Sequence, residues 1–285
     1  MQNQITNRMK KSLFYIFVRK VNIFILFLVF SGLFSCEKED THSNPCQDNT
    51  KIRQVKAQQR VVEEMIYTGE CLIYEYIMEF SYTKYAYNAQ GQLLKADRAI
   101  ILDPTSCFMP VGSNGETYTD PREAPITQYS SYEYDNSGVL VKKLDYYLNG
   151  EEFQLVSYTT YEYEDGYVRH INLYNPRGEL TQKHTYAYDE NGNIIRDEYY
   201  FKEAENVFIL TQTQDFKFDD KVNPYRVFEK EGIPGRFTNP NNIVKITYTD
   251  YYSGQKNVYT TEFLYAYDDS GLPVERDNYA FVYGE

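Results

Sequence analysis

The sequence contains no tryptophan, only three histidines and four cysteines, and no excess of positive charge. Its net charge of −12 argues against nucleic-acid binding and against electrostatic docking on anionic lipid. The GxSxG, P-loop, HExxH and dinucleotide-binding motifs are absent, and no CxxC pair or Cys/His cluster indicates a zinc site. Nothing in the sequence therefore recommends an enzyme, and we expect a non-enzymatic protein with no catalytic residue and no cofactor.

The apolar run Val21–Phe34 is too short for a membrane-spanning helix, which needs roughly 20 apolar residues. A basic flank precedes it, so the run is typical of the hydrophobic region of a signal peptide. Leu33-Phe34-Ser35-Cys36 ends the run and resembles a bacterial lipobox. The resemblance implies that residues 1–35 are a lipoprotein signal peptide and that Cys36 is the lipid-attachment site.

The residues after Cys36 are acidic. Glu37-Lys38-Glu39-Asp40 resembles the export signal that carries Bacteroidetes lipoproteins to the cell surface. We therefore expect residues 36–50 to be an acidic flexible tether. The resemblance implies a protein that is lipid-anchored in the outer membrane and exposed on the cell surface.

Three further cysteines remain after Cys36, which is an odd number. An envelope compartment permits disulfides. We prefer the pair Cys71–Cys107, because Cys107 lies in a long loop that a disulfide would anchor. Cys46–Cys71 is nearly as plausible, and the sequence leaves both pairings open.

Aromatic residues are abundant, with 31 tyrosines and 17 phenylalanines, and many recur in one motif. Two alternating aromatics are followed by Asp or Asn and then by glycine, as in Tyr85-Ala86-Tyr87-Asn88 with Gly91, Tyr132-Glu133-Tyr134-Asp135 with Gly138, Tyr186-Ala187-Tyr188-Asp189 with Gly192, and Tyr265-Ala266-Tyr267-Asp268 with Gly271. The alternation predicts a strand, and the Asx residue and glycine predict a three-residue hairpin loop with a bulge. Asp165-Gly166 instead suits a two-residue type I′ turn.

This motif resembles the YD hairpins of RHS-type repeats, as found in Bacteroidetes surface lipoproteins. The resemblance covers residues 51–285, which we interpret as a single β domain. The predicted fold class is all-β: an antiparallel meander of consecutive hairpins forming a long, strongly twisted or curled, half-barrel-like sheet. Two long loops, at about 103–128 and 229–242, interrupt the rhythm and are either binding elements or surface insertions.

The loops also predict a register. Counting outward from the Asp189 loop places Tyr188 opposite Ile194 and Tyr186 opposite Arg196. The same count predicts the pairs Tyr85–Lys95, Tyr132–Lys142 and Phe216–Arg226, with Tyr265–Glu275 as the exception. A basic residue opposite the first aromatic predicts cross-strand cation–aromatic stacking. Lys51–Tyr67 and Cys71–Tyr87 contain few strand breakers, so we expect long strands there.

Polar residues suggest one further arrangement. If the Asn175 and Asp189 loops set the register, Tyr161, His170, His184 and Glu198 form one row across four strands. Two imidazoles and a carboxylate are able to hold a divalent metal. Cross-strand polar packing remains the default interpretation, so we predict no metal site and keep His170, His184 and Glu198 as candidates only. The acid pairs Asp219-Asp220 and Asp268-Asp269 are better explained by turn chemistry than by paired-carboxylate catalysis.

Three hypotheses about function follow. The first is a non-enzymatic lipid-anchored envelope protein that binds another macromolecule or acts as a scaffold through a tyrosine-rich β-sheet. The second is a glycan-binding accessory lipoprotein of a polysaccharide-uptake system, because exposed aromatic rings stack on sugars, although the missing tryptophan weakens it. The third is a metal-dependent hydrolase that uses the His/His/Glu row. The expected partners are the membrane, through the N-terminal lipid, and an unknown protein or glycan, but no nucleic acid.

Overall fold

The structure is a computed structural model that describes residues 48–100, 118, 120–205, 207–252 and 255–284. The chain divides into two units, Met1–Ser43 and Asn44–Glu285. The predicted signal peptide, Cys36 and most of the predicted tether lie outside the described residues. Among the residues that are described, no helix has the length and apolar character to cross a membrane.

The second unit consists mainly of β-strands. Its first nine strands are β1 (Ile52–Ala57), β2 (Arg60–Tyr67), β3 (Ile73–Met78), β4 (Ser81–Tyr87), β5 (Leu93–Ile100), β6 (Gln128–Tyr134), β7 (Leu140–Asn149), β8 (Glu152–Glu164) and β9 (Tyr167–Tyr174). The remaining strands are β10 (Leu180–Tyr188), β11 (Ile194–Ala204), β12 (Val207–Val222), β13 (Asn241–Tyr252), β14 (Gln255–Glu262), β15 (Tyr265–Tyr267), β16 (Pro273–Arg276) and β17 (Tyr279–Tyr283). Two 3-10 helices, η1 (Pro121–Glu123) and η2 (Pro224–Glu231), interrupt the series.

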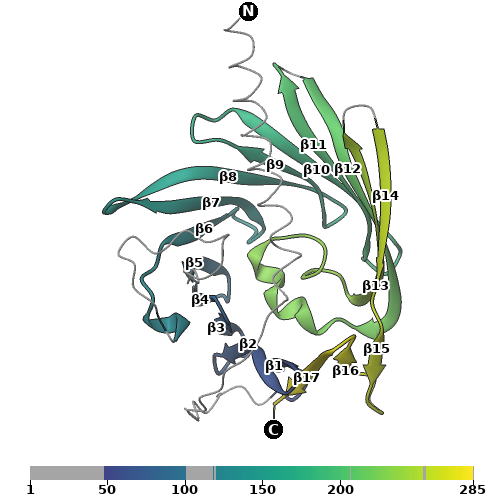
Figure 1. Cartoon of the computed structure of the whole chain (residues 1–285). Helices are drawn as coiled ribbons and strands as arrows, with labels where there is room; N and C mark the ends of the chain where they lie inside the picture. Colours follow the sequence, from purple (N-terminus) through teal and green to yellow (C-terminus); the bar gives the residue numbers. More distant parts are fainter. Residues whose placement is uncertain (1–47, 101–117, 119, 206, 253–254, 285) are drawn as a thin grey trace, which may run out of the picture. The chain divides into compact units, whose positions relative to one another are not determined.

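Strands that follow one another in sequence pair antiparallel from β1 to β14 and again from β15 to β17, forming one curled sheet (Figure 1). The last strand, β17, pairs with β1, so the two ends of this unit are neighbours. Among the described strands no ladder joins β14 to β15, and the chain passes between them through Phe263 and Leu264. The predicted fold class, an all-β antiparallel meander with a curled sheet, is confirmed.

The predicted hairpin loops are confirmed in detail. In each loop the Asx residue's N–H donates to the carbonyl four residues later, and the glycine N–H donates back to the Asx carbonyl. The Asp135 Oδ1 atom accepts from the N–H groups of Ser137 and Val139, both at 2.9 Å. Gly138 has a φ of 84°, which L-residues rarely adopt. The Asp165-Gly166 turn also forms, with φ angles of 54° and 82° as a type I′ turn requires.

The predicted register is wrong by one residue beyond each loop. Tyr188 pairs with Ile194 as expected, but Arg196 then pairs with Ala187, and Tyr186 pairs with Asp197. A β-bulge at Ile195 inserts one unpaired residue and moves every later side chain to the other face. The same shift gives the observed pairs Tyr85–Ala96, Tyr132–Lys143 and Tyr265–Arg276 in place of the predicted ones.

The predicted cation–aromatic pairs are also wrong, because the bulge moves Lys95, Lys142 and Arg196 out of register with the first aromatic of the hairpin. The shift places other basic residues, Lys143 and Arg276, opposite Tyr132 and Tyr265. Lys95 and Lys142 stack instead on aromatic rings of the following strands. The Lys95 Nζ atom lies 4.6 Å from the Tyr129 ring centroid, and the Lys142 Nζ atom lies 4.6 Å from that of Tyr158. Cross-strand stacking is therefore present, but between different partners.

Other expectations about the strands are wrong as well. The segment Lys51–Tyr67 is not one long strand, because Gln58 and Gln59 form a turn with φ angles of 50° and 69°. Cys71–Tyr87 is likewise divided, between β3 and β4. Phe216 does not pair with Arg226, because Arg226 lies in η2 and Phe216 pairs with Ile246. The chain leaves the meander after β12, forms η2, and returns to pair with β12 as β13.

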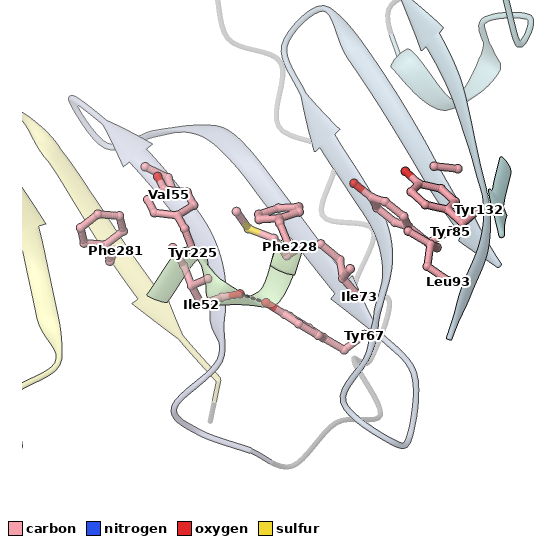
Figure 2. Close-up of a cluster of buried hydrophobic side chains, with 12 residues drawn as sticks. Ile52, Val55, Tyr67, Ile73, Tyr85, Leu93, Tyr132, Tyr225, Phe228 and Phe281 are labelled. Atoms are coloured by element: carbon pink, nitrogen blue, oxygen red, sulfur yellow. Dashed lines mark hydrogen bonds between the residues drawn. The ribbon is translucent and has the colours of Figure 1, made fainter. Parts of the chain in front are cut away.

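Helix η2 supplies part of the main core. The Asn223 side chain caps its first turn by accepting from the Tyr225 N–H, and Gly232 ends it with a φ of 67°. Phe228, 2% exposed, and Tyr225, 3% exposed, pack with the buried side chains of the sheet shown in Figure 2. These sheet residues include Ile52, Val55, Met65, Tyr67, Ile73, Tyr85, Leu93, Tyr132 and Phe281. The segment after β12 thus fills the inner face of the sheet.

Six tyrosine hydroxyls each join one hairpin of the sheet to the hairpin before it. We call these tyrosines the tyrosine ladder: Tyr67, Tyr87, Tyr134, Tyr163, Tyr188 and Tyr283, which donate to the carbonyls of Ile52, Ile73, Leu93, Leu140, Val168 and Pro273 at 2.5–3.0 Å. Five of these acceptor residues are themselves the strand partner of another ladder tyrosine. Ile73, for example, pairs with Tyr67, and Ile52 pairs with Tyr283. The ladder crosses the β17–β1 pair, so it connects the last hairpin to the first.

Candidate functional site

The candidate His/His/Glu row does not form in the predicted way. His170 pairs with Thr185 rather than with His184, and Thr185 pairs in turn with Glu198. His184 pairs with Ile171 and Tyr199, so it lies on the opposite face of the sheet from His170. The reason is again a bulge, between Leu180 and Gln182, which a count from the loops does not include.

The two imidazoles have separate environments. On one face, the His184 Nδ1 atom lies 2.9 Å from Asp197 Oδ1, and the ring packs between Tyr186 and Tyr199. On the other face, the exposed His170 places its Nδ1 atom 3.2 Å from Thr185 Oγ1. No cluster of three or more His, Cys, Asp or Glu side chains suited to a metal ion occurs in the described part of the chain.

His170 nevertheless belongs to a groove on its face of the sheet. The groove has a volume of about 340 Å³ and crosses strands β8 to β12. Its lining residues are Glu162, His170, Asn172, Lys183, Thr185, Tyr200 and Phe208. The volume lies within the range of small-molecule sites.

The groove combines aromatic rings with hydrogen-bonding groups. The Asn172 Nδ2 atom donates to Glu162 Oε1 at 2.6 Å, and the Lys183 Nζ atom lies 4.8 Å from the Phe208 ring centroid. The Tyr200 hydroxyl donates to Glu198 at 2.8 Å, and this bond, with some burial, raises the pKa of Tyr200. Fixed polar groups beside aromatic carbon suit a polyhydroxylated ligand. Sequence reasoning missed Lys183, Tyr200 and Phe208, because only the bulge-corrected register brings them together.

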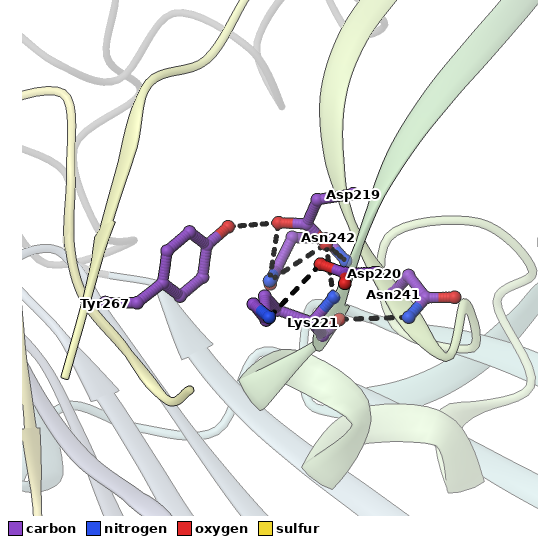
Figure 3. Close-up of polar contacts among 6 residues, drawn as sticks. All are labelled: Asp219, Asp220, Lys221, Asn241, Asn242 and Tyr267. Atoms are coloured by element: carbon purple, nitrogen blue, oxygen red, sulfur yellow. Dashed lines mark hydrogen bonds and ion pairs between the residues drawn. The ribbon is translucent and has the colours of Figure 1, made fainter. Parts of the chain in front are cut away.

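Asp268 and Asp269 lie in a hairpin loop, as predicted, but Asp219 and Asp220 lie within β12, where its register with β13 breaks between Phe218 and Val222. Asp268 Oδ1 accepts from the N–H groups of Ser270 and Leu272. Asp219 accepts from the Lys221 N–H and from Asn242, and Asp220 forms an ion pair with Lys221 at 3.3 Å, as Figure 3 shows.

Tyr267 also donates its hydroxyl to Asp219 (Figure 3). In the β12–β13 pair, the aromatic residue directly before Asp219 is Phe218, which pairs with Ile243. The bond to Asp219 therefore takes the place of a bond to a strand carbonyl where η2 interrupts the meander. Asp219 is thus a structural acceptor that holds β15 against the end of β12.

The cysteines are only partly described. Cys71 is disulfide-bonded and occupies, with a φ of 58°, the loop position that glycine holds in the other hairpins. Cys46 and Cys107 lie outside the described residues, so the pair Cys71–Cys107 stays a prediction. Of the long segment 103–128, η1 and the following residues are described, and Ala124 and Ile126 pack on Tyr82 and Ala99.

No protein-family model and no curated protein matches the chain. Among solved structures, it is similar to a porin-like protein from Bacteroides uniformis, with 10% identity and a TM-score of 0.46 over 83% of this chain and 97% of the other. A porin-like protein from Bacteroides vulgatus is 13% identical, with a TM-score of 0.47 over 82% of this chain and 98% of the other. A chain of the Photorhabdus luminescens Tc holotoxin pore is 14% identical, with a TM-score of 0.21 over 74% of this chain and 13% of the other. Similarities this weak carry no conclusion about function.

Proposed function

We propose that the protein is a lipid-anchored, non-enzymatic envelope protein with a binding or scaffold role. The observation that carries the proposal is the tyrosine ladder, in which hydroxyls of the repeated motif bond to backbone carbonyls of the neighbouring hairpin. These tyrosines act as structural cross-links, which suits a rigid frame held at a membrane. The partners in this proposal are the membrane and a protein or glycan.

The lipid anchor rests on Cys36 and is tested in cells. The wild-type protein should incorporate a clickable fatty acid, sediment with outer membranes and be cleaved by protease added to intact cells. Cys36→Ala should lose all three properties, whereas Cys46→Ala should retain them. Recovery of unlabelled wild-type protein in the soluble cytosolic fraction would contradict the anchor.

The scaffold role is tested by cross-linking on intact cells followed by purification from outer membranes. A reproducible stoichiometric envelope partner, absent from Cys36→Ala cells, supports the proposal. Recovery of the protein alone, at every cross-linker concentration, contradicts a scaffold role.

The groove at His170 favours a second candidate function, glycan binding. Its lining places the Phe208 ring beside hydrogen-bonding groups from Asn172 and Thr185. Replacing Phe208 with alanine should abolish retardation in polysaccharide affinity gels, because stacking of a sugar on an aromatic ring contributes much of such binding. Phe153→Ala is the matched control, since Phe153 is exposed and lies outside the groove. Equal retardation of both variants would exclude the groove as the glycan site.

A further inference from the structure

Strand β14 has one unpaired edge. It pairs with β13 over its full length, from Lys245–Glu262 to Tyr252–Gln255, and the pairing contains no bulge. Among the described strands, none forms a ladder with the other side of β14, which ends the run of paired strands from β1 (Figure 1). The strand also contains no proline. A long, regular edge without proline or a bulge is able to accept a further strand.

One hydrogen bond shows which backbone groups lie at this edge. The Phe263 N–H donates to the Val244 carbonyl at 2.9 Å, continuing the β13–β14 pairing beyond the end of β14. Backbone groups alternate in direction along an antiparallel strand, so those of the odd-numbered residues of β14 also point to β13. The N–H and C=O groups of the even-numbered residues point to the free edge: Lys256, Val258, Thr260 and Glu262. No other described backbone group bonds to them.

The side chains along this edge are exposed and partly apolar. Val258 is 57% exposed and Tyr259 is 48% exposed. Leu264, two residues beyond the strand, is 77% exposed. Pairing with another strand would satisfy the outward backbone groups and remove part of this apolar surface from water, and both changes favour association.

The edge is complementary to a second copy of itself. When two copies of β14 pair antiparallel about a two-fold axis at Tyr259, Lys256 of each copy lies opposite Glu262 of the other. Val258 then lies opposite Thr260, so the outward-pointing residues of the two strands form hydrogen-bonded pairs. The smallest shift that keeps these bonds moves the register by two residues, and in either direction it separates Lys256 from Glu262.

The charges at this edge make the register specific. The Glu262 carboxylate lies 2.7 Å from Lys245 Nζ, and its side chain is still 64% exposed. This bond and the charges of Lys245 and Lys217 lower the pKa of Glu262. Lys256 pairs with Tyr251 on β13, and no ion pair engages it within the described residues. Because two lysines already act on Glu262, the ion pair with Lys256 selects the register, and the backbone bonds and apolar contacts supply most of the stabilisation.

We propose that β14 is a homodimer interface, at which the free edges of two copies of this chain pair antiparallel about Tyr259. The interface joins the two curled sheets into one continuous sheet. It shares no residue with the groove at His170, so it stands independently of glycan binding.

Cysteine substitution tests both the partner and the register. Tyr259 would face Tyr259 of the second copy in a non-hydrogen-bonded pair with Cα atoms about 4.5 Å apart, within reach of a disulfide. Val258 and its counterpart would be diagonal neighbours about 7–8 Å apart, beyond that reach. Under mild oxidation, purified full-length Tyr259→Cys should give roughly tenfold more covalent dimer than Val258→Cys. The wild-type chain controls for the native cysteines.

Equal cross-linking of the two variants, or cross-linking of Val258→Cys alone, would overturn the proposed pairing. The same experiment on intact cells tests the choice of partner. A disulfide from Tyr259→Cys to a different protein, in place of the dimer, would overturn the assignment to a second copy.

Proline at position 258 removes an outward N–H without removing a bond to β13. In sedimentation of the full-length protein, the wild type should dimerise as its concentration rises. Val258→Pro should weaken dimerisation by roughly tenfold or more, because each copy loses a hydrogen bond of the interface. Val258→Ala retains the N–H and is the matched control. A wild-type protein that is monomeric at every concentration, or equal dimerisation of the two variants, would contradict the interface.

Hydrogen exchange of the wild-type protein covers the case in which a variant does not fold. The N–H groups of Lys256, Val258, Thr260 and Glu262 would be bonded only in the dimer, whereas that of Asn257 points to β13 in the monomer as well. Dilution should speed exchange at the four outward N–H groups several-fold and leave exchange at Asn257 unchanged. Exchange at the four groups that does not depend on concentration would contradict the proposal.

Discussion

At the residue scale, a hydrogen bond from the tyrosine hydroxyl explains why the strands of the repeat end in tyrosine. Tyr85, Tyr132 and Tyr186, each the first aromatic of its motif, are buried, with 2–6% of their surface exposed. The second aromatic is half-buried and donates its hydroxyl to a carbonyl of the adjacent hairpin. Phenylalanine would fill the same volume without that bond. The sequence predicted the alternation, but the pattern does not reveal which ring carries the bond.

Replacing Tyr134 with phenylalanine tests one rung of the ladder. The variant loses the 3.0 Å bond to the Leu93 carbonyl, and its free energy of unfolding should fall by about 1 kcal/mol. Urea denaturation measures the change. Tyr174→Phe is the control, because the Tyr174 ring stacks on Tyr158 and its hydroxyl donates to no described residue. Equal loss in both variants would contradict a role for the hydroxyl.

At the scale of the hairpin, the loops were predictable and the bulges were not. The side chain of Asp189 and the positive φ of Gly192 are local requirements, so the sequence states them directly. The bulged residues Leu94, Val141 and Ile195 share no chemistry that distinguishes them from paired residues. Because one inserted residue reverses the facing of a strand, the candidate row at His170 was placed incorrectly.

The sequence did not predict helix η2, for a different reason. The repeat favours another hairpin after Asp219, although Asn223 followed by Pro224 is a recognised helix start. The pairing of β1 with β17 leaves no local signal either, because it joins the two ends of the unit. The groove at His170 depends on the bulges, so it could not be derived from the sequence.

A glycine substitution tests the loop geometry. Gly192 and Gly271 have nearly equal φ angles, 84° and 85°, so alanine should cost about 1–2 kcal/mol at either from backbone strain. At Gly192 the new Cβ would also lie 3.0 Å from the Tyr167 hydroxyl, whereas at Gly271 its nearest neighbour is Lys221 Cδ at 3.6 Å. Gly192→Ala should therefore be the less stable variant in urea denaturation. A larger loss for Gly271→Ala would contradict the closer approach of Tyr167 to the Gly192 loop.

Helix η2 contributes packing that can be measured. The Phe228 ring centroid lies 4.6 Å from that of Tyr76 and 5.2 Å from that of Phe237. Phe228→Ala should lower the free energy of unfolding by about 3–5 kcal/mol, as is usual for a buried aromatic. Lys230→Ala, an exposed change on the same helix, should have little effect. A loss below about 1 kcal/mol for Phe228→Ala, on the same scale, would show that η2 is not part of the core.

At the scale of the whole molecule, tyrosine burial predicts instability at alkaline pH. Burial raises the pKa of Tyr248, and of Tyr225 against nearby positive charge, to about 12, above the ordinary value of 10. Between pH 10 and 12 the unfolded chain has lost these protons while the folded chain retains them. Their contribution is therefore complete below about pH 10 and is lost as the pH rises, at about 1.4 kcal/mol per pH unit for each such tyrosine. Urea denaturation at several pH values measures this slope.

The central claim is that the repeated tyrosines build the interior and the cross-links of the sheet. Titration of phenolate absorbance tests it most directly, because the chain has no tryptophan to add a competing signal. We predict that a minority of the 31 tyrosines ionise near their ordinary pKa and that the others ionise only in a cooperative step, together with loss of the β-sheet circular dichroism. Ionisation of all of them near the ordinary pKa with the sheet intact would contradict the account.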